Sequence, residues 1–172
     1  MRSIFLIGMP GAGKTYWGQQ LAQSHNLPFI DLDVFIEQQD GRSILEIFET
    51  IGETGFRQLE TLALQTVLSE VRHNTIVACG GGTAVHDDNM KRMKQYGCTV
   101  YLRAGLPTLA ERLDKEYGRR PLLTRDPFLL PTLQQMLSAR SNFYEKADYI
   151  LDVENLSLSN FDQIIASCIK QP

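Results

Sequence analysis

The 172-residue chain is 43% hydrophobic and carries a formal net charge of −3, with 22% of its residues charged. This length and apolar content suit one compact domain, residues 1–172, with a core of its own. No basic run indicates a nucleic-acid face, and no apolar stretch approaches the roughly 20 residues that span a bilayer. We therefore expect a cytoplasmic monomer without nucleic-acid or membrane partners.

The three cysteines, Cys79, Cys98 and Cys168, are widely spaced. They are odd in number and form no CxxC pair, which argues against a disulfide framework. Cys79 and Cys98 lie in or beside apolar runs, so we expect them to pack in the core. All three are predicted to be reduced thiols.

Short apolar runs and helical patterns alternate along the chain. Apolar runs predict buried strands at residues 4–7, 29–30, 75–79, 99–102 and 149–151. Helical spacing predicts helices at residues 14–24, 34–39, 43–51, 53–71, 87–96, 106–113, 132–146 and 160–169. Ser43 and Glu46 are spaced for a capping box, Gly52 separates two of these helices, and Gly97 is expected to end another.

This alternation predicts an α/β fold, with a mainly parallel five-stranded sheet between two layers of helices. Ligands of such sheets bind beyond the carboxyl ends of the strands. Residues 8–15, Asp31 with Asp33, and residues 80–82 each follow a predicted strand, so they can share one crevice. Residues 114–131 break the alternation with charges and prolines, and about 114–127 is predicted to be a mobile lid.

Residues 8–15, GMPGAGKT, match the phosphate-loop pattern G-x-x-x-x-G-K-[ST], with a strand before it and a helix after it. The glycines let the backbone aim successive N–H groups at a polyphosphate, and the helix adds its positive dipole end. Lys14 is expected to reach the β and γ phosphates, and the Thr15 hydroxyl to ligate Mg²⁺. The pattern predicts a bound nucleoside triphosphate. The absence of a guanine-reading N-K-x-D sequence argues against a GTPase.

Two carboxylates, Asp31 and Asp33, follow the second predicted strand. No apolar strand ends in an aspartate at the usual mid-chain position, so Asp31 is expected to serve Mg²⁺, either directly or through water. Asp33 has two interpretations: it orients and deprotonates an acceptor hydroxyl, or it caps the next helix. The local sequence does not decide between them.

These motifs together resemble the shikimate kinase family, nearly from end to end. The resemblance rests on their order and spacing: the phosphate loop, Asp31-x-Asp33, Gly41-Arg42-Ser43-Ile44 with Ile47-Phe48, Gly52-Glu53, Phe56-Arg57-x-x-Glu60, the triple glycine at 80–82, Arg120-Pro121-Leu122-Leu123, and Arg140-x-x-x-Tyr144. It implies the nucleoside-monophosphate-kinase type of P-loop fold and an ATP- and Mg²⁺-dependent transfer to the 3-hydroxyl of shikimate. The product is on the route to chorismate and the aromatic amino acids.

The resemblance also implies an acceptor site. Asp33 would contact the ring hydroxyls as the base, and Arg57 and Arg140 would hold the shikimate carboxylate. Gly81 and Gly82 would line the pocket where a side chain would intrude. Glu60 would pair with Arg57, and a helical segment at about 33–60 would bind the acceptor.

On the nucleotide side, Lys14 and Arg120 join Asp33 as catalytic residues, and Arg120 would arrive with the lid. ATP-binding residues would be Gly11, Ala12, Gly13, Lys14, Thr15, Tyr16 and Arg120, with Thr15 and Asp31 at the metal. The Arg-Pro-Leu-Leu register favours Arg120 over Arg119.

The chain departs from the family pattern in two places. Tyr16 and Trp17 replace small residues, and we expect Trp17 to pack inward without changing the chemistry. Residues 152–157 lack the arginine and proline common there, which leaves the adenine contacts unassigned. We assign no role to the three histidines, expect Tyr144 to serve packing, and find no sequence partner for Arg103.

Two other functions stay open. One is a gluconate-type kinase on the same scaffold. Arg57 and Arg140 call for an anionic acceptor, and Asp31-x-Asp33 with the triple glycine matches the shikimate kinase family better. The other is a nucleotide-binding regulatory module without turnover, which the intact set Lys14, Thr15, Asp33 and Arg120 disfavours.

Overall fold

The structure, a computed structural model, describes residues 2–70, 74–115 and 129–169. Its centre is a five-stranded sheet in the order β2-β3-β1-β4-β5, in which every neighbouring pair is parallel. The strands are β1 (Ser3–Ile7), β2 (Phe29–Asp31), β3 (Ile76–Ala78), β4 (Gly97–Arg103) and β5 (Tyr149–Asp152). The predicted five-stranded parallel sheet is therefore confirmed.

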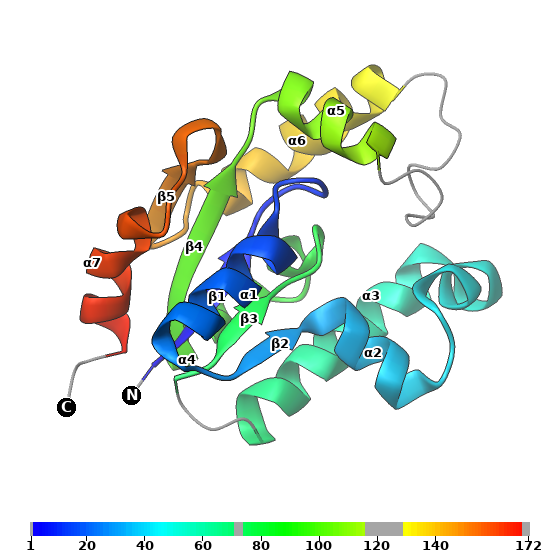
Figure 1. The fold of residues 1–172 in the computed structure, drawn as a ribbon. Coiled ribbons are helices and arrows are strands. Elements are labelled where there is room, and N and C mark those ends of the chain that lie inside the picture. The colour runs from blue at the N-terminus through cyan, green and yellow to red at the C-terminus, as the bar shows by residue number, and fades with distance from the viewer. Residues whose placement is uncertain (1, 71–73, 116–128, 170–172) are drawn as a thin grey trace.

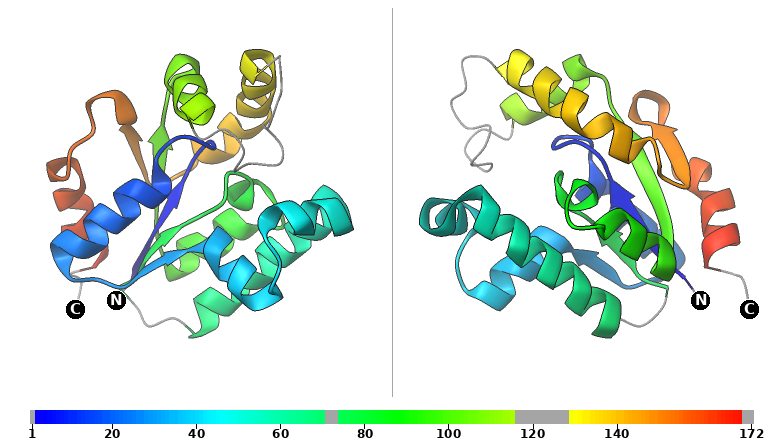
Figure 2. Two further views of the ribbon diagram at one scale, coloured as in Figure 1. Left: turned by 45° about the vertical axis from the view of Figure 1, so that its right-hand side comes forward. Right: turned by 180° about the vertical axis from the view of Figure 1, so that it is seen from behind.

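Helices cover both faces of the sheet (Figures 1 and 2). They are α1 (Lys14–His25), α2 (Leu32–Asp40), α3 (Ile44–Glu70), α4 (Asn89–Tyr96), α5 (Leu106–Lys115), α6 (Leu129–Tyr144) and α7 (Ser159–Cys168), with short 3-10 turns η1 (Thr83–Val85) and η2 (Val153–Asn155). Helices α1 and α7 lie on one face, and α3, α4 and α6 lie on the other. The expected three-layer architecture is present.

Local sequence explains where α3 begins and why it is divided. The Ser43 hydroxyl accepts from Glu46 N at 3.3 Å, and a Glu46 carboxylate oxygen accepts from Ser43 N at 2.7 Å, which confirms the capping box. Gly52, at φ 68°, interrupts the helical backbone. The segment thus forms the two predicted helices, and α2 with the first part of α3 projects as a separate lobe (Figure 1).

Gly97 ends α4 as predicted, and its N–H donates to the Met93 carbonyl. Its backbone is extended rather than left-handed, with a φ of −173°, and it already begins β4. A Cβ at this position would overlap the Ser3 carbonyl of the paired strand β1. The glycine is therefore required by the close approach of two backbones.

The prediction of three reduced cysteines is wrong for two of them. Cys98, at the start of β4, and Cys168, at the end of α7, form a disulfide with Cα atoms 6.1 Å apart. The fold brings together residues separated by 70 positions, a proximity that spacing in the sequence does not reveal. Cys79 is free and buried, as expected for a core residue.

The predicted lid at 114–127 lies outside the described residues, except for Asp114 and Lys115, which end α5. Arg119 and Arg120 fall in the same undescribed segment. Within the described residues, no helix combines the length and the apolar character needed to cross a bilayer.

Candidate active site

The phosphate loop joins the central strand β1 to α1. Gly11 and Gly13 have φ values of 81° and 89°, a region that L side chains rarely adopt, so the loop's path depends on these glycines. Lys14 is 7% exposed, and its ammonium donates to the carbonyls of Gly8 at 3.0 Å and Met9 at 2.9 Å. The lysine is thus held against the loop that it serves.

Asp31 links the phosphate loop to β2. One of its carboxylate oxygens accepts from the Thr15 hydroxyl at 2.6 Å, and the other accepts from Asp33 N at 3.0 Å and Val34 N at 3.4 Å. Asp31 is therefore the N-cap of α2. The structure gives the capping role to Asp31, which leaves the acceptor interpretation for Asp33.

The triple glycine at 80–82 gathers the predicted acceptor residues around it. A Cβ on Gly80 would lie 3.1 Å from Asp33 Oδ1, and a Cβ on Gly82 would overlap the Arg57 guanidinium. Arg140 Nη1 donates to the Gly81 carbonyl at 3.2 Å. Side chains from α2, α3 and α6 thus converge on one loop after β3.

Glu60 holds Arg57 in this cluster. Its carboxylate is fully buried and accepts from Arg57 Nη1 at 2.7 Å and from the Thr83 hydroxyl at 2.6 Å, which confirms the expected pair. Burial by itself would lower the pKa of Arg57, but Glu60, helped by Glu53, keeps that pKa above its ordinary value. Arg57 Nε is buried and has no hydrogen-bond partner among the described residues, so this guanidinium retains a donor.

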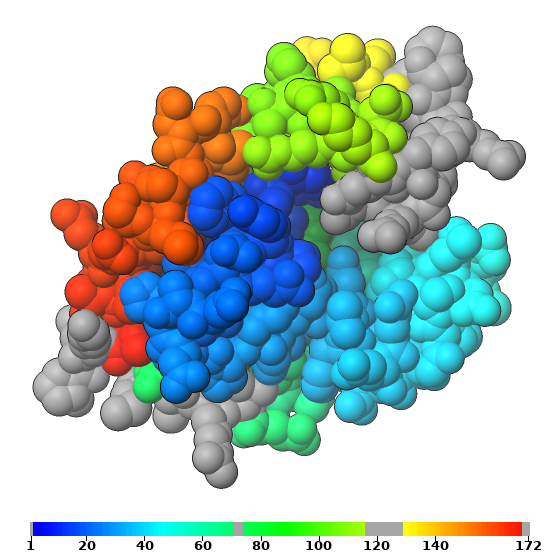
Figure 3. All heavy atoms as spheres, in the orientation of Figure 1, coloured from blue at the N-terminus to red at the C-terminus, as the bar shows by residue number. Residues whose placement is uncertain are grey.

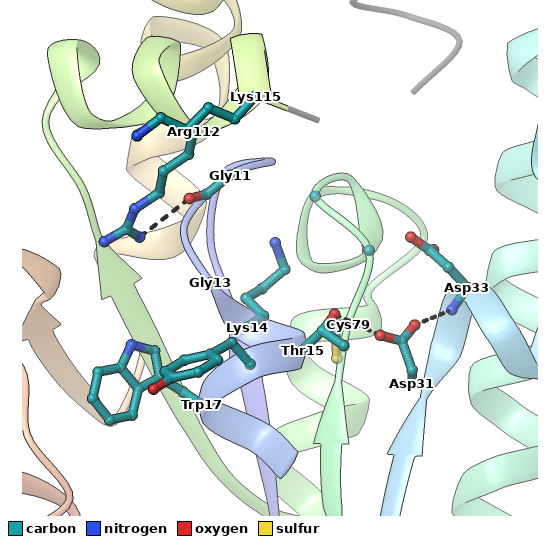
Figure 4. A pocket seen from close by; sticks show the side chains of 13 residues that line it. Gly11, Gly13, Lys14, Thr15, Trp17, Asp31, Asp33, Cys79, Arg112 and Lys115 are labelled. Carbon is teal, nitrogen blue, oxygen red and sulfur yellow. Dashed lines mark hydrogen bonds between the residues drawn. The ribbon is translucent and has the colours of Figure 1, made fainter. Parts of the chain in front are cut away.

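A cavity of about 460 Å³ connects the phosphate loop with Asp33 and the triple glycine. Figure 3 shows the hollow between α5 and the α2–α3 lobe, and Figure 4 shows the side chains around it. Lys14, Thr15 and Asp31 lie between Gly11 on one side and Asp33 on the other. After the roles predicted for these residues, we call the end at the phosphate loop the nucleotide side and the end at Asp33 and the triple glycine the acceptor side; the predicted metal ligands lie between them.

Sequence reasoning missed two basic residues of this cavity, Arg112 and Lys115, both on α5. Arg112 Nη1 donates to the carbonyls of Gly11 and Ala12, each at 3.3 Å, so α5 braces the phosphate loop. The only available signal was the pair of basic residues in the last turn of a predicted helix, which equally fits a solvated surface.

Trp17 and Tyr16 lie at the nucleotide end of the cavity. Trp17 packs against Phe161 of α7, with ring centroids 5.9 Å apart, as its predicted inward packing requires. It also lines the cavity beside Gly13, which the sequence analysis did not anticipate. Tyr16 is 60% exposed.

A model of the shikimate kinase family matches residues 10–171 of the chain. The chain belongs to the shikimate kinase family. A shikimate kinase 2 from Yersinia enterocolitica is 40% identical over 166 residues, which cover 95% of this chain and 94% of that protein. A second shikimate kinase 2, from Serratia proteamaculans, is 37% identical and covers 88% and 86%.

Solved structures give the same result for the shikimate kinase family. The Acinetobacter baumannii enzyme, solved in complex with shikimate, has a TM-score of 0.88 at 32% identity, covering 99% of this chain and 96% of that one. The Bacteroides thetaiotaomicron enzyme has a TM-score of 0.87 at 35% identity, covering 96% and 97%. A gluconokinase from Sinorhizobium meliloti, with a TM-score of 0.58 at 18% identity over 94% and 87%, shares the fold alone.

The donor set of this family member fits Mg²⁺. The Thr15 hydroxyl and the Asp31 carboxylate lie 2.6 Å apart and offer hard oxygen ligands next to the phosphate loop. Among the described residues, no group of three or more His, Cys, Asp or Glu could hold a metal ion. Two protein oxygens suit an ion that takes its other ligands from phosphates and water.

Several residues without an assigned role gain one in this shikimate kinase. Tyr144 is fully buried, as a packing residue would be, and its hydroxyl also donates to the Gly81 carbonyl. Arg103 finds its partner in Asp152 at 2.6 Å. Burial, followed by the positive charge of Arg57, lowers the pKa of His86 below its ordinary value.

Cys79 lines the cavity but is chemically quiet. Burial, followed by the negative charge of Glu60, raises the pKa of its thiol far above the ordinary value. Its Sγ lies 3.6 Å from Sδ of Met93, a fully buried residue of α4. Because the thiolate is the nucleophile, this cysteine does not qualify as one.

Proposed function

We propose that the chain transfers the γ-phosphoryl group of ATP to the 3-hydroxyl of shikimate, giving ADP and 3-phosphoshikimate. The observation that carries this proposal is the convergence of Asp33, Arg57 and Arg140 on the triple glycine, across the cavity from Lys14. Two guanidinium groups and one carboxylate suit an acceptor that is both an anion and an alcohol. Family membership supports the same acceptor.

On the nucleotide side, the phosphate loop binds the triphosphate through backbone N–H groups and the amino end of α1. Lys14 contributes a positive charge at the β and γ phosphates. Thr15 and Asp31 would hold Mg²⁺, which neutralises phosphate charge when bound. Tyr16 stays an ATP-binding assignment, and Arg112 joins it because it braces Gly11 and Ala12.

On the acceptor side, Arg57 and Arg140 bind the carboxylate and fix the orientation of the ring. Gly81 and Gly82 leave room for the ring against the loop backbone. Asp33 orients the hydroxyl and takes its proton as the oxygen bonds to the γ phosphorus and the bond to the bridging oxygen of ADP breaks. The α2–α3 lobe, residues 33–60, carries much of this side.

Arg120 completes the proposed machinery. It lies outside the described residues, and its role as a charge stabiliser on the transferring phosphoryl group rests on the Arg-Pro-Leu-Leu register. The lid role of residues 114–127 has the same basis. A monomeric state and a cytoplasmic location complete the proposal.

The test is ADP release by the purified protein with ATP, Mg²⁺ and, separately, shikimate, quinate and gluconate. We expect turnover with shikimate that disappears with EDTA and returns with Mg²⁺. Arg57→Lys serves as the matched variant, because it keeps the charge but loses the bidentate fork, and should raise the KM for shikimate only. Turnover with gluconate instead would contradict the acceptor assignment.

A regulatory module is the second candidate function. It would bind ATP and leave it intact with every acceptor, which a nucleotide-binding measurement beside the same assay would reveal. The Glu60–Arg57–Thr83 network opposes this candidate, because a buried charged network at the acceptor side serves no purpose in a module that only binds nucleotide.

A further inference from the structure

A groove of about 610 Å³ is lined by residues of η1, α4 and α6 and by Lys146. Here η1 packs against both α4 and α6, on the face of the sheet opposite α1; Figure 2 shows how these elements are arranged. One wall comes from η1 and α4, and the other comes from the last turn of α6 and the residues after it. The groove shares no lining residue with the cavity that holds the phosphate loop.

The groove is lined by apolar and by basic side chains. We call its four apolar residues, Ala84, Val85, Met90 and Phe143, the floor, and its five polar or charged residues, Asp88, Lys91, Lys94, Gln95 and Lys146, the rim. Phe143 is 36% exposed, so an aromatic face is open to a ligand. The rim carries three ammonium groups and the Asp88 carboxylate, and Asp148 pairs with one of the lysines, so one positive charge is left in balance.

The three lysines differ in how far they are already engaged. Lys94 donates to Asp148 at 2.9 Å. The Lys146 ammonium lies 5.3 Å from the centroid of the Phe143 ring, so charge and aromatic face occupy the same end of the groove. Lys91 has no hydrogen bond or ion pair with any described residue. Lys91 and Lys146 are thus the cations that an incoming anion can neutralise.

We propose that this groove is a second ligand site, that it binds an aromatic carboxylate, and that its occupancy is coupled to the acceptor side of the active site. A flat ring covers the apolar floor against Phe143, and a carboxylate meets the free ammonium groups. An amino acid brings an ammonium group that the lysines repel. A polyhydroxylated ring such as shikimate buries its hydroxyls against an apolar floor without partners.

The coupling follows from what the two walls hold. The η1 wall continues directly from the triple glycine, and Val85 N donates to the Gly82 carbonyl at 2.9 Å. The α6 wall carries Arg140 and Tyr144, which both donate to the Gly81 carbonyl. A ring bound between the walls contacts both of the segments that are joined at this carbonyl. Arg140 is then drawn from its place in the acceptor site.

Binding is tested by calorimetric titration of the full chain with 4-hydroxybenzoate, with L-tyrosine and shikimate as comparison probes. We expect heat from the groove with 4-hydroxybenzoate. Phe143→Ser and Lys91→Glu should each weaken it by about tenfold, because one removes the aromatic face and the other reverses a rim charge. Tyr96→Ser and Arg2→Glu are the controls: they likewise remove an aromatic ring and reverse a positive charge, but at exposed positions outside the groove, and should leave the binding unchanged.

Coupling is tested by steady-state kinetics, and this arm rests on the proposed function. 4-hydroxybenzoate should raise the KM for shikimate by about fivefold and leave the KM for ATP unchanged. Phe143→Ser should abolish that rise while keeping the basal kinetics. If the rise survives in Phe143→Ser, the probe competes at the acceptor site and the proposal is overturned.

The binding arm does not depend on turnover. If Phe143→Ser, Lys91→Glu and the unmodified chain bind 4-hydroxybenzoate equally, the groove is not its binding site, and the proposal is overturned even if shikimate is phosphorylated. Conversely, a chain that phosphorylates none of the acceptors but loses 4-hydroxybenzoate binding in both variants would refute the proposed function and keep the site. Stronger binding of L-tyrosine than of 4-hydroxybenzoate would refute the assigned ligand class.

Discussion

The nucleotide and acceptor sides of the cavity are built in opposite ways. The phosphate loop is one continuous segment, residues 8–15, whose backbone carries most of its chemistry. The acceptor side is assembled from side chains on α2, α3 and α6 around residues 80–82, and these positions are far apart in the sequence. A local motif specifies the first half, whereas the second exists only when the whole domain is folded.

This difference teaches where each half is vulnerable. The phosphate loop depends chiefly on glycine conformations and a strand-to-helix junction, with support from Arg112 and Asp31. The acceptor half depends on one buried carboxylate, Glu60, which fixes Arg57 and Thr83 together. A buried charge without its partner is costly, so damage to any member should spread through that half.

Lys14→Ala should have the largest effect, a fall in kcat of about a thousandfold, because a preorganised positive charge at the transferring phosphoryl group is lost. Stopped assays of ADP formation measure it. The lysine also holds Gly8 and Met9, so the melting temperature must be measured in parallel. Near-normal turnover in a folded variant would mean that the loop does not work through this residue.

Asp33→Asn should affect the acceptor half and leave nucleotide binding unchanged. We expect kcat to fall by about a hundredfold or more, since the proton acceptor is removed, while nucleotide affinity stays the same. Asp31→Asn is the matched control, because it should instead change the Mg²⁺ concentration needed for half-maximal activity. Unaltered kcat in Asp33→Asn would remove this residue from the mechanism.

Gly82→Ala tests the acceptor half through packing alone. Its new Cβ would overlap the Arg57 guanidinium and displace it, so the KM for shikimate should rise by about tenfold, with the KM for ATP unchanged. Gly105→Ala, whose Cβ would meet nothing closer than 3.4 Å, is the control. A matched rise in both KM values would show that the two halves are not separable.

Asp148→Asn should have the smallest effect and touch neither half. Asp148 accepts from Thr99 N and Oγ1, both at 2.8 Å, and from Lys94, so the substitution should cost about 1 kcal/mol, part of it screened by water. Burial opposes the shift, but these donors hold the pKa of Asp148 below its ordinary 3.8.

The pH dependence of this small effect has a definite sign. A depressed folded-state pKa gives stability that is present above pH 3.8 and lost as the pH falls through the lower, folded value. Urea unfolding should therefore separate Asp148→Asn from the unmodified chain at pH 7 and bring them together in acid. Glu111→Gln, which loses only an exposed pair with Lys115, should match the unmodified chain throughout. A gap that widens in acid would contradict this account.

Local signals predicted the fold and the position of the phosphate loop between a strand and a helix. Three features depend only on residues that are close together in the sequence, and the structure has each at its predicted position. They are the phosphate loop, the capping box of Ser43 and Glu46, and the helix break at Gly52. The alternation of strands and helices predicted a parallel sheet, because two parallel strands need a crossover connection, usually a helix, between them.

Tertiary proximity explains what the sequence could not predict. The Cys98–Cys168 disulfide, the pair of Arg103 and Asp152, and the bracing of the phosphate loop by Arg112 each join separate elements. Asp31 and Asp33 stand two residues apart with the same chemistry, so only the backbone geometry at the start of α2 could show which one is the cap. The acceptor half was predicted through family resemblance, since each arginine alone resembles a surface charge.

The position of β1 has a consequence for hydrogen exchange. All five of its residues are buried, and it lies between β3 and β4 in the middle of the sheet. Amide protons in such a strand exchange chiefly when the whole domain opens. A nucleotide on the loop that follows β1, at a hundred times its Kd, would stabilise the native state by about 2.7 kcal/mol. The amide protons of β1 would then exchange about a hundredfold more slowly. Their exchange rate would therefore report how much of the protein has nucleotide bound at the phosphate loop.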